Sequence, residues 1–329
     1  MIVVTGGAGF IGSALVWRLN QRGINDILIV DHLGKSEKWR NLVGLRFLDY
    51  LDKSVFISMI ESGELDSKIS AVLHMGACSA TTELDADYLM ENNYRYTLRI
   101  GKWWEKNKKA RFIYASSAAT YGDGAQGYDD DASKLYTLKP LNMYGYSKHL
   151  FDCMAAQNGW LKNIAGLKFF NVFGPNEDHK GDMRSVINKA YPRVRDEGKI
   201  SLFQSHRPDY KNGEQLRDFV YIKDVVEMTL YFLDHPEANG IFNIGTGKAR
   251  SWNDIAMALF KAAGKKPSIE YVPMPQAIRD KYQYFTQANP DKLRRAGCLY
   301  ECRSLEDSIL DYVNNHLQTG TLLGNSKES

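Results

Sequence analysis

The stretch MIVVTGGAGFIGSALVWRLNQRG, residues 1–23, decides the fold that we expect for this chain. Residues 1–4 are an apolar run of strand length, residues 5–12 contain the spacing GxxGxxG, and residues 13–22 have the pattern of a helix that Gly23 ends. Glycines let a backbone turn sharply and approach a pyrophosphate closely, and the helix N-terminus that follows offers unpaired N–H groups. This order of elements predicts a dinucleotide-binding unit rather than a simple tight turn.

Further apolar runs continue the pattern that residues 1–23 begin. Each has strand length, helical stretches separate them, and such runs are typical of strands that are buried on both faces. They comprise residues 27–30, 71–74, 112–115 and 166–170. Alternating buried strands and helices predict an α/β protein with a Rossmann-type, doubly wound parallel sheet and right-handed crossovers.

The second half of the chain has a different pattern. After Asn171, proline- and glycine-marked loops such as GPNEDHKGD (174–182) and HRPDYKNG (206–213) interrupt the sequence, and one more apolar strand is expected at 240–244. We therefore expect a smaller, discontinuous C-terminal substrate lobe. The expected dinucleotide-binding domain takes residues 1–172 and roughly 217–245, the substrate lobe takes 173–216 and 246–318, and residues 319–329, which lack an aromatic anchor, form a flexible tail.

Composition narrows the choice of partners and compartment. The 42 basic and 39 acidic residues give a net charge of +3 without a block of like charge, so we expect no nucleic-acid partner. No run approaches the roughly 20 apolar residues of a membrane span, and no secretory signal is recognisable, so we expect a cytoplasmic protein that does not enter the membrane. The cysteines Cys78, Cys153, Cys298 and Cys302 form no CxxC pair, which favours reduced thiols over a metal site or disulfides.

Asp31 lies at the end of the second apolar run, 19 residues after Gly12. A carboxylate at this place can accept hydrogen bonds from an adenosine ribose, although it could also simply cap a strand end. An aspartate here favours NAD because it repels a 2′-phosphate, whereas Lys38 and Lys53 could neutralise one. We expect NADP, with NAD as a close alternative.

A tyrosine and a lysine have the spacing of an acid–base pair. Tyr144 and Lys148 are four residues apart in YGYSK, so a helix places them on one face. A neighbouring ammonium and a nicotinamide cation would both favour the phenolate, which makes Tyr144 a candidate general base. Ser117 follows the strand predicted at 112–115, where open α/β sheets bind ligands, and could hold the reacting hydroxyl. The competing interpretations are a tyrosine packed on a helix surface and ordinary turn chemistry.

Together these motifs resemble the extended short-chain dehydrogenase/reductase family, whose members act on nucleotide sugars. The resemblance covers almost the whole chain, and its longer motifs are similar to the branch that epimerises C6″ of ADP-heptose for the inner core of lipopolysaccharide. Those motifs are HMGACSATTE (74–83), ENNY (91–94), YASSAATYG (114–122), PLNMYGYSKHLFD (140–152), FFNVFGPNEDHKGDM (169–183), RDFVYIKDV (217–225), FNIGTG (242–247) and YQYFTQA (282–288). In that branch a loop lysine serves as a second base, and Lys180 matches it; otherwise Lys180 is an exposed loop lysine without a role.

The resemblance also implies which residues bind the two ligands. For the cofactor these are Gly6, Gly9, Phe10, Ile11, Gly12, Asp31, His32, Lys38, Lys53, Met75, Gly76, Ala77, Cys78, Ser79, Asn92, Tyr144, Lys148, Val172 and Lys180. For the ADP-sugar they are Ser79, Ser117, Asn171, Asp182, Lys189, Phe203, Gln204, Arg217 and Tyr282. Arg217 offers a planar fork to the diphosphate, or else pairs with Asp218. Residues 204–215 depart from the family pattern by their length, and the family implies a homo-oligomer, a pentamer by analogy.

Other functions remain open from the sequence. A nucleotide-sugar 4-epimerase or a reductase of the same family shares these motifs. A 4,6-dehydratase of this kind carries an acidic pair just after the serine, where this chain has Ala118 and Ala119, so elimination lacks its acid. A non-catalytic dinucleotide sensor on the same fold typically lacks the tyrosine–lysine pair that this chain has.

Overall fold

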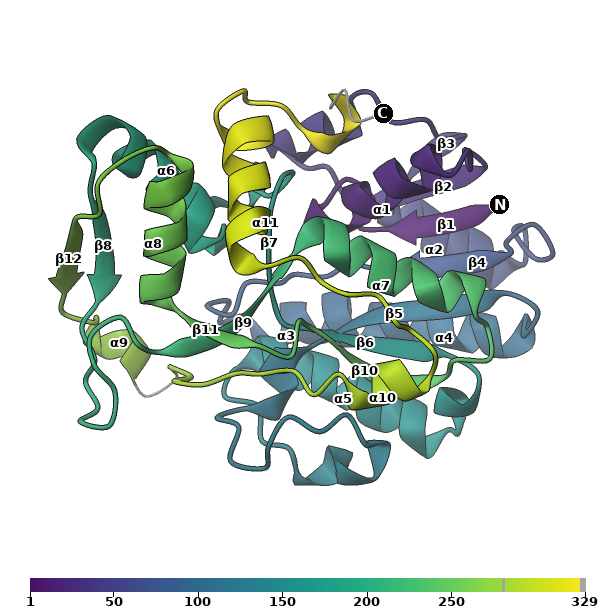
Figure 1. Cartoon of the computed structure of the whole chain (residues 1–329). Coiled ribbons are helices and arrows are strands. Elements are labelled where there is room, and N and C mark those ends of the chain that lie inside the picture. Colours follow the sequence, from purple (N-terminus) through teal and green to yellow (C-terminus); the bar gives the residue numbers. More distant parts are fainter. Residues whose placement is uncertain (280–281, 326–329) are drawn as a thin grey trace.

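A computed structural model describes residues 1–279 and 282–325 of the chain. Its centre is a parallel sheet with the strand order β10-β6-β5-β4-β1-β2-β3 (Figure 1). The strands are β1 (Ile2–Thr5), β2 (Ile27–Asp31), β3 (Asp49–Asp52), β4 (Ala71–His74), β5 (Arg111–Ser117), β6 (Ala165–Phe169) and β10 (Gly240–Ile244). The predicted doubly wound parallel sheet is confirmed.

The strand order sets the place of a ligand site. From β1 the chain builds outward through β2 to β3, and it then crosses to β4 on the other side of β1. Thr5 at the end of β1 pairs with Val30 of β2 and with His74 of β4, so these strand ends lie at the same edge. In open α/β sheets, ligands bind outside the carboxyl ends of the strands where the order reverses, which here is between β1 and β4.

Helices cover both faces of the sheet because alternate strand residues point to opposite sides. Val4, Ile29 and Leu73 belong to a core that includes α1 (Phe10–Gln21) and α7 (Ile222–Asp234). Their neighbours Val3, Leu28 and Val72 belong to a second core. The helices that contribute to this second core are α2 (Lys53–Ser62), α4 (Tyr96–Lys106) and α5 (Met143–Gln157).

A smaller group of elements lies beside the central sheet (Figure 1). A three-stranded sheet in the order β11-β9-β7 connects it to the centre, and β8 pairs with β12 further out. The strands are β7 (Asn171–Phe173), β8 (Ile200–Phe203), β9 (Leu216–Tyr221), β11 (Ala249–Ser251) and β12 (Ile269–Val272). The main helices of this group are α6 (Val186–Glu197), α8 (Trp252–Ala262) and α11 (Leu305–Tyr312), and a short one is α9 (Gln276–Arg279). The short helices α3 (Ala86–Leu89) and α10 (Asp291–Arg295) belong to the larger part, where α3 packs against α5 and α10 against β10.

The structure differs from the sequence-based expectation at several elements. The first helix begins at Phe10, inside the glycine motif, rather than at residue 13. β3 was not expected, because its sequence DYLD has no apolar run and the strand lies partly exposed at the sheet edge. In the predicted tail, residues 319–325 pack against the body: Leu323 is buried, and its N–H donates to Asn176 Oδ1 at 3.0 Å. The remaining tail residues, 326–329, lie outside the described residues.

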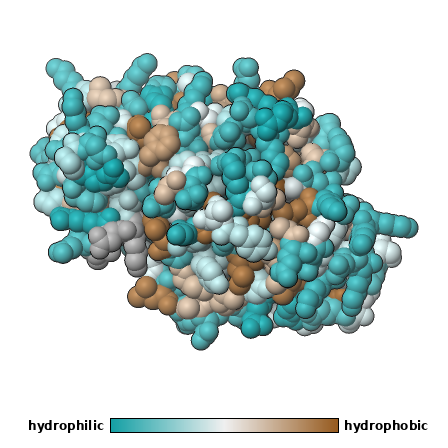
Figure 2. Space-filling model, turned by 90° about the horizontal axis from the view of Figure 1, so that it is seen from below, coloured by the Kyte–Doolittle hydropathy of each residue, from teal (hydrophilic) through white to brown (hydrophobic). Residues whose placement is uncertain are grey.

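Figure 2 shows hydrophobic residues in small groups between hydrophilic ones. No helix in residues 1–279 and 282–325 is long and apolar enough to cross a membrane.

Candidate active site

A cavity of about 650 Å³ lies at the carboxyl edge of the central sheet. Residues after β1, β4, β5 and β6 form one side of it, and residues from the smaller lobe form the other. Most residues expected at the cofactor line this cavity: Gly6, Gly9, Phe10, Ile11, Gly12, Asp31, Lys38, Met75, Gly76, Ala77, Cys78, Ser79, Tyr144, Lys148, Val172 and Lys180. Ser79, Ser117 and Asn171 from the expected substrate set line it as well.

The glycine loop forms a cradle with no room for side chains. Gly6 has a φ of +65°, and a Cβ on it would lie 2.7 Å from the Gly76 backbone. A Cβ on Gly12 would lie 2.1 Å from the Gly6 carbonyl oxygen. Helix α1 begins directly behind this cradle, with Gly9 as its N-cap and no acidic residue in its first turn. A helix N-terminus left open in this way fits an anionic pyrophosphate.

Asp31 is held by the protein itself. Its Oδ2 accepts the Ala8 N–H at 2.9 Å, and its Oδ1 accepts the His32 N–H at 2.7 Å. The Lys38 ammonium also binds Oδ1, at 2.6 Å, in a largely buried ion pair. Since Lys38 lines the cavity next to Asp31, the charge of the carboxylate is offset at the place where an adenosine ribose would bind.

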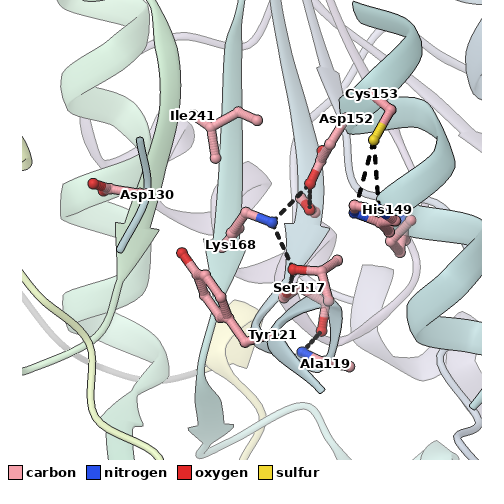
Figure 3. Close-up of polar contacts among 12 residues, drawn as sticks. Ser117, Ala119, Tyr121, Asp130, His149, Asp152, Cys153, Lys168 and Ile241 are labelled. Atoms are coloured by element: carbon pink, nitrogen blue, oxygen red, sulfur yellow. Dashed lines mark hydrogen bonds and ion pairs between the residues drawn. The ribbon is translucent and has the colours of Figure 1, made fainter. Parts of the chain in front are cut away.

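The end of β5 presents Ser117 to the cavity and is fixed by a buried network (Figure 3). Lys168 and Asp152, which are 1% and 0% exposed, form an ion pair at 2.9 Å. Asp152 also accepts the Ser116 hydroxyl, at 2.7 Å, while Lys168 donates to Thr120 Oγ1 at 2.5 Å. The Thr120 hydroxyl in turn donates to the Ser117 carbonyl at 2.8 Å. The strand end that carries Ser117 therefore has little freedom to move.

Helix α5 carries the tyrosine and lysine of the YxxxK motif. Its N-cap residue, Asn142, accepts the Gly145 N–H at 2.8 Å, which starts the helix one residue before Tyr144. Lys148 lies one turn later, is buried, and donates to the Ala115 carbonyl oxygen at 2.8 Å. Both side chains line the cavity, as expected.

The surroundings of Tyr144 act on its pKa in opposite directions. Burial raises the pKa of Tyr144, and a hydrogen bond with Ser117 opposes this. The Lys148 ammonium binds the Ala115 carbonyl oxygen, and burial lowers the pKa of Lys148 to about 8. A positive charge bound beside the Tyr144 hydroxyl would favour its phenolate.

A short π-helix, Met90–Arg95, ties the cavity wall to helix α5. Asn93 accepts the Cys78 N–H and donates to the Cys78 carbonyl, both at 2.9 Å. It also donates to Ser147 Oγ at 3.1 Å, and the Ser147 hydroxyl donates to the Tyr144 carbonyl at 2.7 Å. Asn93 thus links the expected cofactor wall to the helix of the tyrosine, a role that the sequence did not indicate. Asn92, which was assigned to the cofactor, instead accepts the Lys53 ammonium at 2.5 Å.

Lys180 reaches the cavity from the short 3-10 helix Asp178–Met183. Its ammonium lies over the Phe10 ring, 5.2 Å from the ring centre, at the start of α1. Burial lowers the pKa of Lys180, and the nearby Glu177 carboxylate opposes this shift. Lys180 is therefore not the exposed loop lysine of the alternative interpretation. A partly desolvated amine in a cavity, with its pKa below the usual value, gives up its proton more readily than an exposed lysine does.

The other expected contacts lie outside this cavity as far as the described residues show. They are His32, Lys53, Asn92, Asp182, Lys189, Phe203, Gln204, Arg217 and Tyr282. His32 pairs with Asp52 at the surface. Lys189 binds the Asp182 carbonyl oxygen at 3.0 Å, and residues 204–205 join a surface loop.

Arg217 and Tyr282 form a pair directly behind the cavity. The Arg217 guanidinium lies 5.1 Å from the centre of the Tyr282 ring. Tyr282 accepts a hydrogen bond from the indole N–H of Trp252 at 2.9 Å, and Trp252 lines the cavity. Asp218, the alternative partner of Arg217, instead accepts the N–H groups of Thr246, Gly247 and Ala288.

The cavity also has wall residues that the sequence did not indicate. They are Ser36, Ala80, Ala115, Ser116, Phe169, Phe170, Phe173, His179, Met183, Arg184, Ser185, Val186, Ile187, Phe219, Trp252 and Ile255. His179 could have been found because it adjoins Lys180 in the quoted loop motif. Phe219 of β9 lies in the quoted motif RDFVYIKDV, whereas the wall residues from α6 and α8 belong to no motif, and only the folding of the smaller lobe brings them to the sheet.

Comparison with known proteins identifies relatives over nearly the full length. Residues 2–245 match the model of the NAD dependent epimerase/dehydratase family. A protein of Nitratidesulfovibrio vulgaris (strain DP4) named ADP-L-glycero-D-manno-heptose-6-epimerase is 56% identical over 317 residues, which cover 96% of this chain and 98% of the relative. A Fusobacterium nucleatum protein with the same name is 49% identical over 326 residues, with the same coverage.

Solved structures of similar proteins also match almost the whole chain. The ADP-L-glycero-D-manno-heptose-6-epimerase of Helicobacter pylori is 28% identical and superposes with a TM-score of 0.78, covering 95% of this chain and 94% of that one. A UDP-glucose 4-epimerase of Thermus thermophilus, solved in complex with NAD, is 26% identical with a TM-score of 0.76, covering 95% and 97%.

Proposed function

The chain belongs to the NAD dependent epimerase/dehydratase family, and on that premise we propose that it inverts C6″ of ADP-D-glycero-D-manno-heptose to give the L-glycero epimer. This reaction makes a heptose donor for lipopolysaccharide. It proceeds through a ketone and has no net redox change. The observation that carries the proposal is that Ser117, Tyr144 and Lys180 line one cavity beside the glycine cradle.

The residues of the cavity fit a nicotinamide dinucleotide. The glycine loop and the N-terminus of α1 would hold the pyrophosphate, and Asp31 with Lys38 would face the adenosine ribose. When bound, the nicotinamide takes a hydride from the substrate carbon and returns it. Lys148 would orient the second ribose, and Ser117 would hold the reacting oxygen of the sugar.

Inversion explains why the site needs two proton carriers. During oxidation one group takes the proton of the C6″ hydroxyl. The ketone then turns over in the cavity, so its oxygen lies elsewhere when the carbon is reduced from the opposite face. A second group must give the proton there. We assign these roles to Tyr144 and Lys180, each serving one of the two epimers.

The ADP-sugar would bind between the sheet edge and the smaller lobe. Arg217 is the candidate partner of the diphosphate: its guanidinium lies over the Tyr282 ring, and the Tyr282 hydroxyl binds Trp252 of the cavity wall. Asn171 and Ser79 already line that wall. Asp182, Lys189, Phe203 and Gln204 would contact the substrate only after the lobe closes on it.

For the cofactor we infer a preference for NADP. The Lys38 ammonium offsets the charge of Asp31, which otherwise repels a 2′-phosphate, and it can reach such a group from the cavity wall. Mass spectrometry of the nucleotide released on denaturing the purified protein checks this. NADP is the expected species, and NAD alone would contradict the inference.

The activity is tested by offering the purified protein two substrates, ADP-D-glycero-D-manno-heptose and UDP-galactose. We expect the first to be converted to its L-glycero epimer and the second to be left unchanged. Conversion of UDP-galactose to UDP-glucose without action on the heptose would instead establish a 4-epimerase. Failure to turn over either sugar with cofactor bound would favour a non-catalytic sensor.

We also propose a homo-oligomer located in the cytoplasm, as in the family that the sequence resembles. Light scattering on the purified protein measures the subunit number, for which family analogy suggests five. A monomer at micromolar concentration would contradict this proposal.

A further inference from the structure

The loop that carries Lys180 is closed at its base by one buried carboxylate. Residues 174–185 connect strand β7 to helix α6. Glu177, which is 0% exposed, accepts the Gly174 N–H at 3.2 Å on Oε1, and the Ser185 N–H at 2.6 Å on Oε2. The Ser185 hydroxyl adds a third hydrogen bond, at 2.7 Å. Glu177 therefore joins the first residue of the loop to its last.

The same residue also connects the loop to Lys180 and to the C-terminal part of the chain. The Glu177 carbonyl accepts the Lys180 N–H at 3.0 Å, which shapes the turn that presents the lysine. On the other side, the Tyr312 hydroxyl at the end of α11 donates to Glu177 Oε1 at 3.1 Å. A buried carboxylate is destabilising unless hydrogen bonds compensate it, and these donors supply that compensation.

The residue before Glu177 is anchored as firmly. Asn176 has a φ of +75° and is 1% exposed. Its side-chain amide donates to Ser13 Oγ of helix α1 at 2.9 Å, and its carbonyl accepts the amide of Asn41 at 3.0 Å. The loop is thus attached to the helix whose Phe10 ring lies under the Lys180 ammonium.

We propose that Glu177 is the positioning residue of the second base: by closing the loop 174–185 it holds the Lys180 ammonium over Phe10 in the cavity. Glu177 does not line the cavity, so it acts through Lys180 and not on the substrate. The proposal rests on the proposed function, because it takes Lys180 as the proton carrier for one epimer. It implies that loss of the carboxylate slows the oxidation of that epimer only.

The variant Glu177→Gln tests this with little change in volume. One carboxylate oxygen becomes an NH₂ group, which cannot accept an N–H, so at least one connection at the base of the loop is lost. Tyr312→Phe is the matched control, because it removes one donor to Glu177 and leaves the carboxylate. Thermal unfolding verifies that both variants fold, and Glu177→Asp replaces Glu177→Gln if the latter does not.

Two readouts separate positioning from a general loss of structure. Hydrogen exchange by NMR reports the amides of Gly174 and Ser185, and we expect Glu177→Gln to lose protection there while Tyr312→Phe keeps it. Stopped-flow absorbance of the reduced nicotinamide reports the oxidation of each purified epimer. The variant Lys180→Met identifies the epimer whose oxidation depends on Lys180. We expect Glu177→Gln to slow the oxidation of that epimer about tenfold, because a small displacement of a proton carrier already lowers the rate. The oxidation of the other epimer should be unchanged.

The outcomes are distinguishable. If Lys180→Met slows neither epimer, the two-base function itself is wrong. If Lys180→Met slows one epimer while Glu177→Gln slows both equally or neither, the function stands and the positioning role of Glu177 is wrong.

Discussion

Two regions of the molecule bring the proposed proton carriers to one cavity, and they are built differently. Tyr144 and Lys148 lie one turn apart on α5, a regular helix of 15 residues packed on the central sheet. Lys180 lies on a short 3-10 helix between β7 and α6, and side chains from distant parts of the chain hold it in place. The first region obtains its geometry from helix periodicity. The second obtains it from contacts of long sequence separation.

Because the two regions are built differently, substitutions in them should have different consequences. Helix α5 stays formed when a side chain on it is shortened, so a substitution there removes one chemical group and little else. In the loop, a substitution can also release the backbone that carries the base. Substitutions in the two regions test this contrast, and the largest effect is expected on α5.

Replacing Tyr144 by phenylalanine removes the phenol and keeps the ring. We expect kcat for epimerisation to fall about 10³-fold, because general acid–base groups contribute on that order. The matched control is Tyr146→Phe on the same helix, whose ring is 45% exposed and which should turn over like the wild type. Equal rates in the two variants would remove Tyr144 from the mechanism.

Replacing Lys180 by methionine should lower kcat about 10²-fold and leave the thermal unfolding temperature near that of the wild type. The ammonium makes a cation–π contact with Phe10, but a methionine side chain can also pack on that ring. Lys199→Met is the control, since Lys199 is exposed and pairs only loosely with Glu270, at 3.4 Å. A Lys180→Met enzyme with wild-type kcat would show that one base is enough.

His74, at the end of β4, should make the stability of the fold depend on pH. It is fully buried between Thr5 and Thr97, with ring nitrogens 2.6 Å and 2.8 Å from their hydroxyls. The Thr97 hydroxyl donates to the Asn93 carbonyl, so a neutral ring that donates from Nε2 and accepts at Nδ1 satisfies the whole chain. Burial lowers the pKa of His74 from 6.5 to about 3.

Because the folded-state pKa lies below the unfolded one, the stability is complete above pH 6.5 and is lost as the pH falls from 6.5 toward 3. At pH 5 this histidine alone should cost about 2 kcal/mol of the free energy of unfolding relative to neutral pH. Urea unfolding of the wild type and of His74→Asn at both pH values measures it. The variant should lack this part of the pH dependence, and an unchanged difference between pH 7 and pH 5 would contradict a neutral buried His74.

Tyr312→Phe should have the smallest effect of the set. Its hydroxyl donates to Glu177 and accepts the Asn188 amide at 2.8 Å, and Asn188 keeps a second acceptor in Asp178. We expect a loss of about 1 kcal/mol in the free energy of unfolding, the usual value of one buried hydrogen bond, with kcat unchanged. A kcat that falls as far as that of Lys180→Met would mean that α11 itself sets the position of the second base.

The same contrast explains what could be predicted from the sequence. The glycine spacing, Asp31 and the pair Tyr144–Lys148 obey local rules of turns and helices, and the structure places all of them at one cavity. The sequence did not indicate the role of Asn93, which binds the Cys78 backbone and Ser147 from the π-helix Met90–Arg95. A local sequence pattern does not predict a π-helix.

The surroundings of Lys180 could not be predicted for a different reason. Glu177 and Tyr312 are 135 residues apart, and Asn176 and Ser13 are 163 apart. Contacts over such separations exist only after the whole chain has folded. The hydrogen bond from the Leu323 N–H to Asn176 Oδ1 spans 147 residues and is equally hard to predict from a local pattern.

Epimerisation in heavy water tests the central claim most directly, namely that the hydrogen on C6″ leaves the sugar as a hydride and returns to it. The wild-type enzyme converts unlabelled ADP-D-glycero-D-manno-heptose in D₂O, and mass spectrometry with NMR locates any deuterium in the product. We predict an L-glycero product that carries its original hydrogen at C6″ and no deuterium on carbon. Deuterium at C6″ would show that the carbon exchanges a proton with solvent, and it would contradict oxidation and re-reduction by a held nicotinamide.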